Sequence, residues 1–372
     1  MARTIHLSAT CLCGAVCQSI TSDSVDYAEA HNFRATENLS QDALFCHCNT
    51  CRKSSGLMFT SYVACGAPLL GSLDFLEACE AGKGDMRYFC KKCGCHVFRS
   101  LSRAGEEDMR WFVATGTIDP VKGLKLVHFV GHENLSETAD GGGAVWLKEV
   151  EGGEMQMFEG AGPDYYSGTT HQVVLKASCH CGTVKFHITR PDASSRLPTI
   201  PFPDLMIAYH TQDPKLKNLD DEKWWIKGDR YLAGTCACRS CRLASGFEIQ
   251  EWTFVPKSNI FFNTQAGKNL PLDFADKGIK SVLKSYESSE GVVREFCAKC
   301  GATVFWRGKW RSELIDVSVG LLEAEEGARA EKWLDWWTER VSFEEDAVAH
   351  GRSLVDGLQK GIAAWGGKRE AA

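Results

Sequence analysis

Cysteines are the residues of this chain whose number and spacing point most directly to chemistry. The sequence holds 18 of them in 372 residues. The first half contains Cys11-Leu-Cys13-Gly14, then Cys46-His-Cys48-Asn-Thr-Cys51-Arg52, then Cys90-Lys-Lys-Cys93-Gly94. The second half contains Cys179-His-Cys181-Gly182, then Cys236-Ala-Cys238-Arg-Ser-Cys241-Arg242, then Cys297-Ala-Lys-Cys300-Gly301. Three clusters that recur in the same order, with the same internal spacing, indicate a duplicated domain.

The first and third clusters of each half have the spacing of a closed metal site. Two thiolates in Cys-x-x-Cys-Gly can hold one ion from a tight turn, and the glycine permits a positive φ there. A Cys-x-Cys pair on a strand places both sulfurs on one face. We therefore predict two four-thiolate zinc sites that stabilise the fold rather than catalyse a reaction. The first outer cluster is Cys11, Cys13, Cys90 and Cys93, and the second outer cluster is Cys179, Cys181, Cys297 and Cys300.

The second cluster of each half has only three thiols. Three thiolates leave a tetrahedral zinc ion one open position, which is the arrangement of a catalytic zinc. Such an ion can polarise a carbonyl group or hold a substrate thiol as the thiolate. The alternative is a further structural site with an unrecognised fourth ligand. One zinc ion at the outer cluster and one at the middle cluster would give about two zinc ions per domain. The first middle cluster is Cys46, Cys48 and Cys51, and the second middle cluster is Cys236, Cys238 and Cys241.

Four cysteines lie outside these clusters, all of them in the first half. Cys95 follows Cys93 closely enough to be considered as a fourth ligand of the middle cluster, but the equivalent residue of the second half is Ala302. We therefore interpret these four residues as ordinary buried thiols. They are Cys17, Cys65, Cys79 and Cys95.

Histidine and arginine residues beside the clusters are secondary candidates. His47 is a possible acid or base next to the first middle cluster, but its counterpart is Ala237, and a structural role is favoured for it and for His180. Arg52 and Arg242 follow the last cysteine of each middle cluster. Either guanidinium can offset the negative charge of a three-thiolate site or pair with a substrate carboxylate, and the alternative is a solvated surface arginine.

Composition places these thiols in a reducing compartment. The chain is 44% hydrophobic and 24% charged, as expected of a globular protein. Its apolar runs are much shorter than a membrane span, and residues 1–10 lack the apolar region of a secretory signal. We expect a location in the cytosol or nucleus, where disulfides are rare. The formal net charge is −6 and neither half is strongly basic, which argues against nucleic-acid or membrane partners.

The distance between the two copies grows along the chain. It is 168 residues from Cys11 to Cys179, 190 from Cys46 to Cys236 and 207 from Cys90 to Cys297. The second copy therefore carries insertions, and residues 191–230, with five of the ten prolines, predict an irregular excursion. Eight glycines within residues 141–168 indicate a linker. We predict a first zinc domain at 1–145, a linker at 146–170, a second zinc domain at 171–345, and a C-terminal helix and tail at 346–372.

Short strand-like runs predict a mainly β fold. Most are four to eight residues long, rich in β-branched and aromatic side chains, and bounded by turn residues. Only residues 345–365 predict a helix, because Val348, Val355, Leu358 and Ile362 form one apolar face, which we expect to pack on the second domain. The predicted strands are Val16–Ile20, Phe59–Ala64, Trp111–Thr115, Lys125–Val130, Thr183–Ile188, Trp252–Val255 and Leu314–Val319.

The order of the clusters resembles that of a known family. Cys-x-Cys-Gly, Cys-x-Cys-x-x-Cys-Arg with a downstream Ser-Gly, and Phe-Cys-x-x-Cys-Gly are similar to the glutathione-dependent formaldehyde-activating enzyme and centromere protein V family, as a tandem, fungal-like member. The resemblance implies two zinc-containing β-tent domains. It also implies structural zinc at the outer clusters and a labile zinc, with glutathione, at the middle clusters.

The resemblance further implies a carbon–sulfur lyase that joins glutathione, or a similar small thiol, to a small electrophile such as formaldehyde to give S-hydroxymethylglutathione. The alternative is a non-catalytic, zinc-stabilised binding or scaffold module. In the centromere branch, association with microtubules and chromatin implies a basic extension, and the sequence contains no such stretch. We therefore favour the enzyme.

Overall fold

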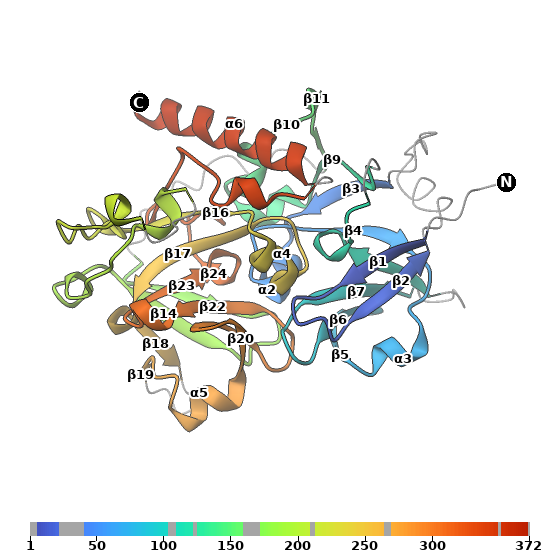
Figure 1. Ribbon diagram of the computed structural model, residues 1–372, viewed down its shortest axis with the longest axis horizontal. Coiled ribbons are helices and arrows are strands. Elements are labelled where there is room, and N and C mark those ends of the chain that lie inside the picture. Colours follow the sequence, from blue (N-terminus) through green and yellow to red (C-terminus); the bar gives the residue numbers. More distant parts are fainter. Residues whose placement is uncertain are drawn as a thin grey trace.

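The chain forms a mainly β structure with a long helix at its C-terminal end (Figure 1). The computed structural model describes residues 6–21, 41–102, 109–121, 125–158, 172–208, 213–263, 269–348 and 351–370. This confirms the predicted fold class of a mainly β chain with a C-terminal helix, and cysteine clusters that could hold metal ions lie in both halves. Among the helices of these residues, none combines the length and apolar character needed to cross a membrane.

The first half is built on a hairpin and one large mixed sheet. Strands β1 and β2 pair antiparallel, and the sheet has the order β12-β9-β3-β4-β8-β7-β6-β5. Its elements are β1 (His6–Thr10), β2 (Cys17–Thr21), β3 (Gln41–Cys46), α2 (Asn49–Ser55), β4 (Thr60–Cys65), α3 (Leu70–Leu73), β5 (Leu76–Gly82), β6 (Asp85–Cys90), β7 (His96–Leu101), β8 (Arg110–Ala114), β9 (Val127–Glu133), β10 (Glu149–Val150), β11 (Gly153–Glu154) and β12 (Gln156–Met157).

The second half repeats this topology with additions. The parallel pair β3–β9 is matched by β16–β25, and the β1–β2 hairpin by β13–β14, which here belongs to a larger sheet. Its elements are β13 (Val174–Ser178), β14 (Lys185–Thr189), β15 (Ile226–Lys227), β16 (Arg230–Cys236), α4 (Arg239–Ser245), β17 (Gln250–Pro256), β18 (Ile260–Asn263), β19 (Asn269–Pro271), α5 (Lys277–Val282), β20 (Leu283–Ser289), β21 (Val292–Cys297), β22 (Thr303–Gly308), β23 (Leu314–Ser318), β24 (Leu322–Glu323), β25 (Leu334–Trp336) and α6 (Arg352–Glu370).

All seven predicted strands are present, as β2, β4, β8, β9, β14, β17 and β23. The predicted C-terminal helix begins later than expected, because residues 344–346 form a separate 3-10 turn and α6 begins at Arg352. Three of the four residues of its predicted apolar face are buried within α6: Val355, Leu358 and Ile362. The expectation that helix occurs only near the C-terminus was wrong, since α2 and α4 each carry part of a middle cluster.

The two halves meet through reciprocal contacts around α2 and α4, which lie at the centre of the molecule (Figure 1). The amide of Gly116 donates to the carbonyl of Gly246, and the amide of Gly320 donates to that of Gly56, both at 3.0 Å. Leu12 donates to a carbonyl of α4, and its counterpart His180 donates to a carbonyl of α2. The duplicated halves are thus related by an approximate two-fold symmetry.

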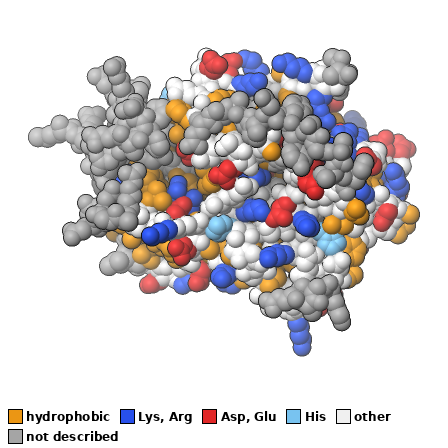
Figure 2. All heavy atoms as spheres, turned by 180° about the vertical axis from the view of Figure 1, so that it is seen from behind, with side chains coloured by type: hydrophobic (Ala, Val, Ile, Leu, Met, Phe, Trp, Pro, Cys, Tyr) orange, Lys and Arg blue, Asp and Glu red, His pale blue; other side chains and the backbone are white. Residues whose placement is uncertain are grey.

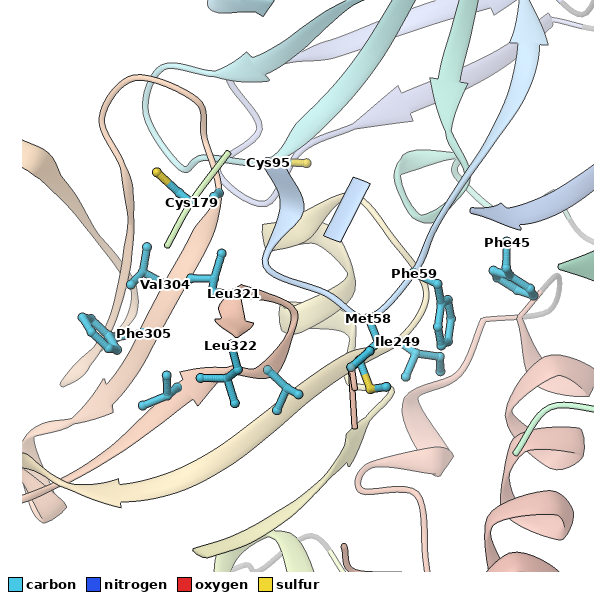
Figure 3. Packing of buried hydrophobic residues seen from close by; sticks show 14 of the residues in the cluster. Phe45, Met58, Phe59, Cys95, Cys179, Ile249, Val304, Phe305, Leu321 and Leu322 are labelled. Atoms are coloured by element: carbon cyan, nitrogen blue, oxygen red, sulfur yellow. The ribbon is translucent and has the colours of Figure 1, made fainter. Parts of the chain in front are cut away.

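Side chains of both halves form one hydrophobic core. Met58 and Phe59 from the first half pack in the same cluster as Ile249 and Leu322 from the second (Figure 3). Lys53 of α2 forms an ion pair with Glu323 of the other half, and Ser178 donates to the same carboxylate at 2.5 Å. The two halves therefore stabilise each other.

The described part of the predicted linker is folded. Trp146 and Leu147 are fully buried, and Trp146 packs edge-on against Trp336 of the second half and Trp365 of α6. Helix α6 covers this segment closely, because a Cβ added to Gly361 would lie 1.5 Å from the Trp146 carbonyl oxygen. Helix α6 therefore packs on residues of both halves. Residues 159–171 lie outside the described part of the chain.

The surface carries charges of both signs. On the face turned away from the viewer in Figure 1, basic, acidic and hydrophobic side chains of the described residues are interspersed (Figure 2). This distribution agrees with the modest net charge of −6.

A buried carboxyl group at the junction of the halves predicts a pH effect on stability. Glu251 is fully buried and accepts a hydrogen bond from the amide of Met58 at 2.9 Å. Burial raises the pKa of Glu251 from 4.5 to about 8. The folded chain thus keeps a proton that the unfolded chain loses, so this contribution to stability is complete below pH 4.5 and is lost as the pH rises through 8.

We expect Glu251→Gln to remove this pH dependence, because the glutamine oxygen still accepts from Met58. Relative to the variant, the native chain should lose on the order of 3 kcal/mol of unfolding free energy between pH 6 and 9. Urea unfolding across that range measures the difference. Replacement of the exposed Glu290 by glutamine serves as the control. Parallel curves for the native chain and Glu251→Gln would contradict the expectation.

Candidate metal and thiol-binding sites

The structure brings the four sulfurs of each outer cluster together. In both, the ligand atoms all lie within 4.8 Å of one another. The Cys13 sulfur lies 3.6 Å from those of Cys11 and Cys90, and the Cys181 sulfur lies 3.5 Å from that of Cys179 and 3.6 Å from that of Cys297. Four sulfurs at this spacing can surround one metal ion. None of the 18 cysteines forms a disulfide, so no such bond competes for these positions.

Local backbone geometry explains why the sequence folds into these clusters. Gly94 and Gly301 have φ angles of 81° and 75°, as the turn after Cys-x-x-Cys was predicted to require. Each also lies against the opposite half, because an added Cβ would meet Phe296 at 2.6 Å and Phe89 at 2.4 Å, respectively. The outer clusters therefore connect strands within each half and support the contact between halves.

Each middle cluster lies where a strand ends and a short helix begins. Cys46 ends β3, Cys48 is the N-cap of α2, and Cys51 lies in its first turn. The Cys51 amide donates to the Cys48 sulfur at 3.3 Å, and the sulfurs of Cys46 and Cys48 lie 3.4 Å apart. The second middle cluster has the same arrangement at α4, with the Cys241 amide 3.2 Å from the Cys238 sulfur. Cysteine thus takes the role that serine or aspartate has at other N-caps.

Among the described residues, no histidine, cysteine or carboxylate joins either middle cluster as a fourth ligand within 4.8 Å of the three sulfurs. Cys48 and Cys238 are only partly buried, whereas Cys51 and Cys241 are buried. In the described part of the chain, each middle cluster therefore has three sulfurs, with the N-cap sulfur nearest to solvent.

A buried arginine that the sequence did not lead us to predict contacts a sulfur of each middle cluster. Arg87 donates to the Cys51 sulfur at 3.5 Å, and Arg294 donates to that of Cys241 at 3.4 Å. Hydrogen bonds from Cys46 and Cys48, followed by the charge of Arg87, hold the pKa of the Cys51 thiol well below its ordinary value despite burial. These arginines therefore favour thiolate at the innermost position of each cluster. The sequence contained a signal, since both copies have Arg-x-x-Cys at the third cluster.

The arginines singled out from the sequence have hydrogen-bond partners other than the cluster sulfurs. Arg52 is buried and donates to the Asn49 side chain at 2.6 Å, within α2. Arg242 is buried and donates to the carbonyl of Gly116 in the other half. Neither is a solvated surface arginine. Binding of a substrate carboxylate by Arg52 or Arg242 stays a prediction.

The histidine of the first middle cluster is part of a buried chain of hydrogen bonds. The His47 Nε2 lies 2.9 Å from the His132 Nδ1, and the His132 Nε2 lies 2.7 Å from the Leu147 carbonyl oxygen. Burial holds the pKa of His47 well below its ordinary value, so the ring stays neutral. His180 is half-buried, and its amide joins the two halves. These contacts agree with the structural role favoured for both histidines.

The four remaining cysteines differ in exposure. Cys65 and Cys95 are buried, Cys79 is half-buried and Cys17 is exposed. The interpretation as buried thiols is therefore wrong for Cys17, whose position on the short β1–β2 hairpin faces solvent.

Polar side chains surround the first middle cluster. Asn134 donates to the Cys46 sulfur at 3.2 Å. The Arg87 guanidinium lies over the Tyr62 ring, 5.1 Å from its centre. Arg99 stands opposite Arg87 in the sheet and binds Asp85 through two hydrogen bonds of 2.9 Å. This arrangement can neutralise negative charge at the sulfurs and offer donors to a polar ligand.

Comparison with known proteins places both halves in one family. Residues 6–129 and 223–340 match the model of a family described as glutathione-dependent formaldehyde-activating enzyme. The first region contains all seven cysteines of its two clusters, whereas the second contains five and begins after Cys179 and Cys181. Searches of curated proteins and of solved structures found no match. The matched regions make up more than half of the chain.

Proposed function

Because the chain belongs to the glutathione-dependent formaldehyde-activating enzyme family, we propose that it is a zinc-dependent carbon–sulfur lyase acting on glutathione or a similar small thiol. The proposed electrophile is formaldehyde or another small carbonyl compound. The observation that supports this most strongly is the pair of three-sulfur middle clusters, each with a buried arginine behind it and, among the described residues, no fourth ligand. We expect the reaction in the cytosol or nucleus, where thiols stay reduced.

The donor sets fit zinc. Zn–S bonds of about 2.3 Å in a tetrahedron place sulfurs roughly 3.8 Å apart. In the outer clusters, neighbouring sulfurs lie 3.5 to 3.7 Å apart. Backbone amides complete the surroundings, since Val16 and Val184 each donate to a cluster sulfur at 3.3 Å. We propose four zinc ions per chain, one held by each outer cluster and one by each middle cluster.

The proposed reaction joins a thiol to a carbonyl carbon. The sulfur–carbon bond forms, the carbonyl double bond becomes single, and the proton of the thiol ends on the carbonyl oxygen, so no other reactant is needed. A zinc ion at a middle cluster would supply a Lewis acid for the thiol or carbonyl group. The side chains of Arg87 and Asn134 lie against the sulfurs and would offset negative charge there. Tyr62 and Arg99 would help to orient a polar thiol beside the cluster.

The proposal predicts faster exchange between formaldehyde and its glutathione adduct. Exchange NMR with zinc-loaded protein should show a rate at least about tenfold above buffer, since positioning alone can contribute more than that. Cys48→Ser should lose the contribution of the first middle cluster, because serine is a poor zinc ligand. Cys238→Ser should do the same for the second middle cluster, and the double variant should have the rate of buffer.

Cys17→Ser is the matched control, because Cys17 is an exposed thiol outside all four clusters. It should exchange at the native rate. If zinc-loaded native protein gives no acceleration, the formaldehyde reaction is excluded. If the Cys48→Ser chain does not fold, the first middle cluster is structural, as a binding module would require.

A further inference from the structure

The two middle clusters have different surroundings, although their cysteines superimpose in sequence and topology. Tyr62 and Arg99 lie on strands beside the first middle cluster. The equivalent strand positions beside the second middle cluster hold Trp252 and Trp306. Trp306 stands directly opposite Arg294, as Arg99 stands opposite Arg87. Trp252 belongs to one apolar cluster with Cys236 and Cys241, against which Trp306 packs. Two tryptophans thus stand beside the second cluster where a tyrosine and an arginine stand beside the first.

A third position beside the middle clusters is also polar in the first half and aromatic in the second. The amide of His47 donates to the carbonyl of Glu133, and the equivalent Ala237 donates to that of Ser342. The next residue is Asn134 in the first half and Phe343 in the second, and both have left-handed backbones with φ of 59° and 56°. Asparagine tolerates this conformation, whereas phenylalanine is strained in it. Phe343 is therefore held beside the second middle cluster against its backbone preference.

The inserted segment of the second half supports this aromatic wall. Asp204 of the insertion binds Arg311 at 2.6 Å, and the Arg311 guanidinium lies 4.5 Å from the centre of the Trp306 ring. Trp306 also packs edge-on against Trp310, with ring centres 5.6 Å apart. Trp310 is 46% exposed. Aromatic rings thus extend from the second middle cluster to the surface.

The guanidinium of Arg294 contacts a sulfur of this cluster directly. Arg294 is 3% exposed and donates through Nη2 to Ser240 and Cys241, while its Nε and Nη1 have no hydrogen-bond partner among the described residues. In the first half, Arg87 binds the carboxylate of Asp85, but the equivalent strand position is Val292. The second cluster therefore combines aromatic side chains with a guanidinium that donates to a cluster sulfur and, among the described residues, has no carboxylate equivalent to Asp85. This combination suits an anionic sulfur attached to an apolar group.

We propose that the second middle cluster binds thiols that carry an aromatic group, whereas the first middle cluster binds polar thiols such as glutathione. This inference rests on the proposed function only in assigning thiols to the middle clusters. The residues that determine the difference are Trp252, Trp306 and Phe343 in the second half. The equivalent residues of the first half are Tyr62, Arg99 and Asn134. The two halves would then act on different members of one class of substrate.

Calorimetric binding of benzyl mercaptan and glutathione to zinc-loaded full-length chain tests this. Cys48→Ser leaves the second middle cluster intact, and we expect it to bind benzyl mercaptan at least about tenfold more tightly than glutathione, as burial and stacking of one ring predict. Cys238→Ser leaves the first and should show the reverse preference. Zinc-free protein should bind neither thiol. Equal affinities of both thiols for both variants would overturn the proposal.

Exchanged residues test which side chains cause the preference. In the Cys48→Ser chain, Phe343→Asn and Trp306→Arg introduce the residue types of the first half and should each weaken benzyl mercaptan binding severalfold, with zinc content unchanged by mass spectrometry. Phe343→Asn relieves backbone strain, so it should fold even if Trp306→Arg does not. The assignment of these side chains would be overturned if Phe343→Asn bound benzyl mercaptan with unchanged affinity and Trp306→Arg either did the same or failed to fold.

The outcomes separate this inference from the proposed lyase. Exchange of formaldehyde adducts with equal thiol preference at both clusters would support the lyase and overturn the inference. Selective binding of benzyl mercaptan by the Cys48→Ser chain, together with no exchange activity in the native chain, would support the inference and exclude the formaldehyde reaction.

Discussion

Replacing Cys90 by serine is expected to unfold the chain, whereas replacing Cys48 is expected to leave it folded with one zinc ion fewer. Cys90 is fully buried and connects β6 to the β1–β2 hairpin through the first outer cluster. Zinc binding at such structural sites is worth on the order of 10 kcal/mol, which is comparable to the whole stability of a typical chain at about 5–15 kcal/mol. Cys48 is partly exposed at the start of a seven-residue helix, and its cluster connects only neighbouring segments.

Native mass spectrometry and circular dichroism measure both effects. We expect four zinc ions on the native chain, two of which are removed by mild chelation without loss of structure. Cys90→Ser should lack cooperative thermal unfolding, while Cys48→Ser should keep it with three zinc ions. Cys17→Ser again serves as the control. A native chain with two ions, both resistant to chelation, would contradict zinc at the middle clusters.

The sequence was sufficient to predict which sulfurs lie together, because ligand spacing is a local property. Cys93 and Gly94 illustrate this, since the tight turn and positive φ follow from Cys-x-x-Cys-Gly alone. In both halves, the prediction that the Cys-x-x-Cys sulfurs lie beside those of the Cys-x-Cys pair is confirmed. The helices at the middle clusters were missed because seven residues are too few to show an apolar period, although Gly56 and Gly246 mark their ends.

Contacts between distant strands were beyond reach for a different reason. Arg87 lies near Cys51, 36 positions away in the sequence, only because β6 places it there. The repeated Arg-x-x-Cys marks Arg87 but does not indicate which cluster it approaches. Asn134 and Phe343 are equivalent through strand pairing and not through neighbouring sequence. The predicted domain and linker boundaries stay predictions, but the buried side chain of Trp146 shows that glycine content alone does not indicate a flexible segment.

Two glycines at the junction of the halves predict the other large effect. A Cβ added to Gly56 would lie 2.1 Å from the carbonyl oxygen of Thr303, and one added to Gly246 would lie 2.0 Å from that of His96. Backbone atoms are the obstacle in both cases, so no side-chain rotation relieves the clash. We expect Gly56→Ala and Gly246→Ala each to lower the unfolding free energy by about 3–5 kcal/mol, from left-handed backbone strain and overpacking together.

Gly228→Ala separates these two contributions. Gly228 also has a positive φ, at 63°, but an added Cβ would meet no atom within 4 Å. It should therefore show only the backbone cost of about 1–2 kcal/mol in urea unfolding. Because one core contains side chains of both halves, Gly56→Ala should also shift the unfolding of the second half, observed through tryptophan fluorescence. If Gly56→Ala and Gly228→Ala were equally destabilising, or only the first half were affected, the halves would fold independently and the reciprocal contacts would contribute little to stability.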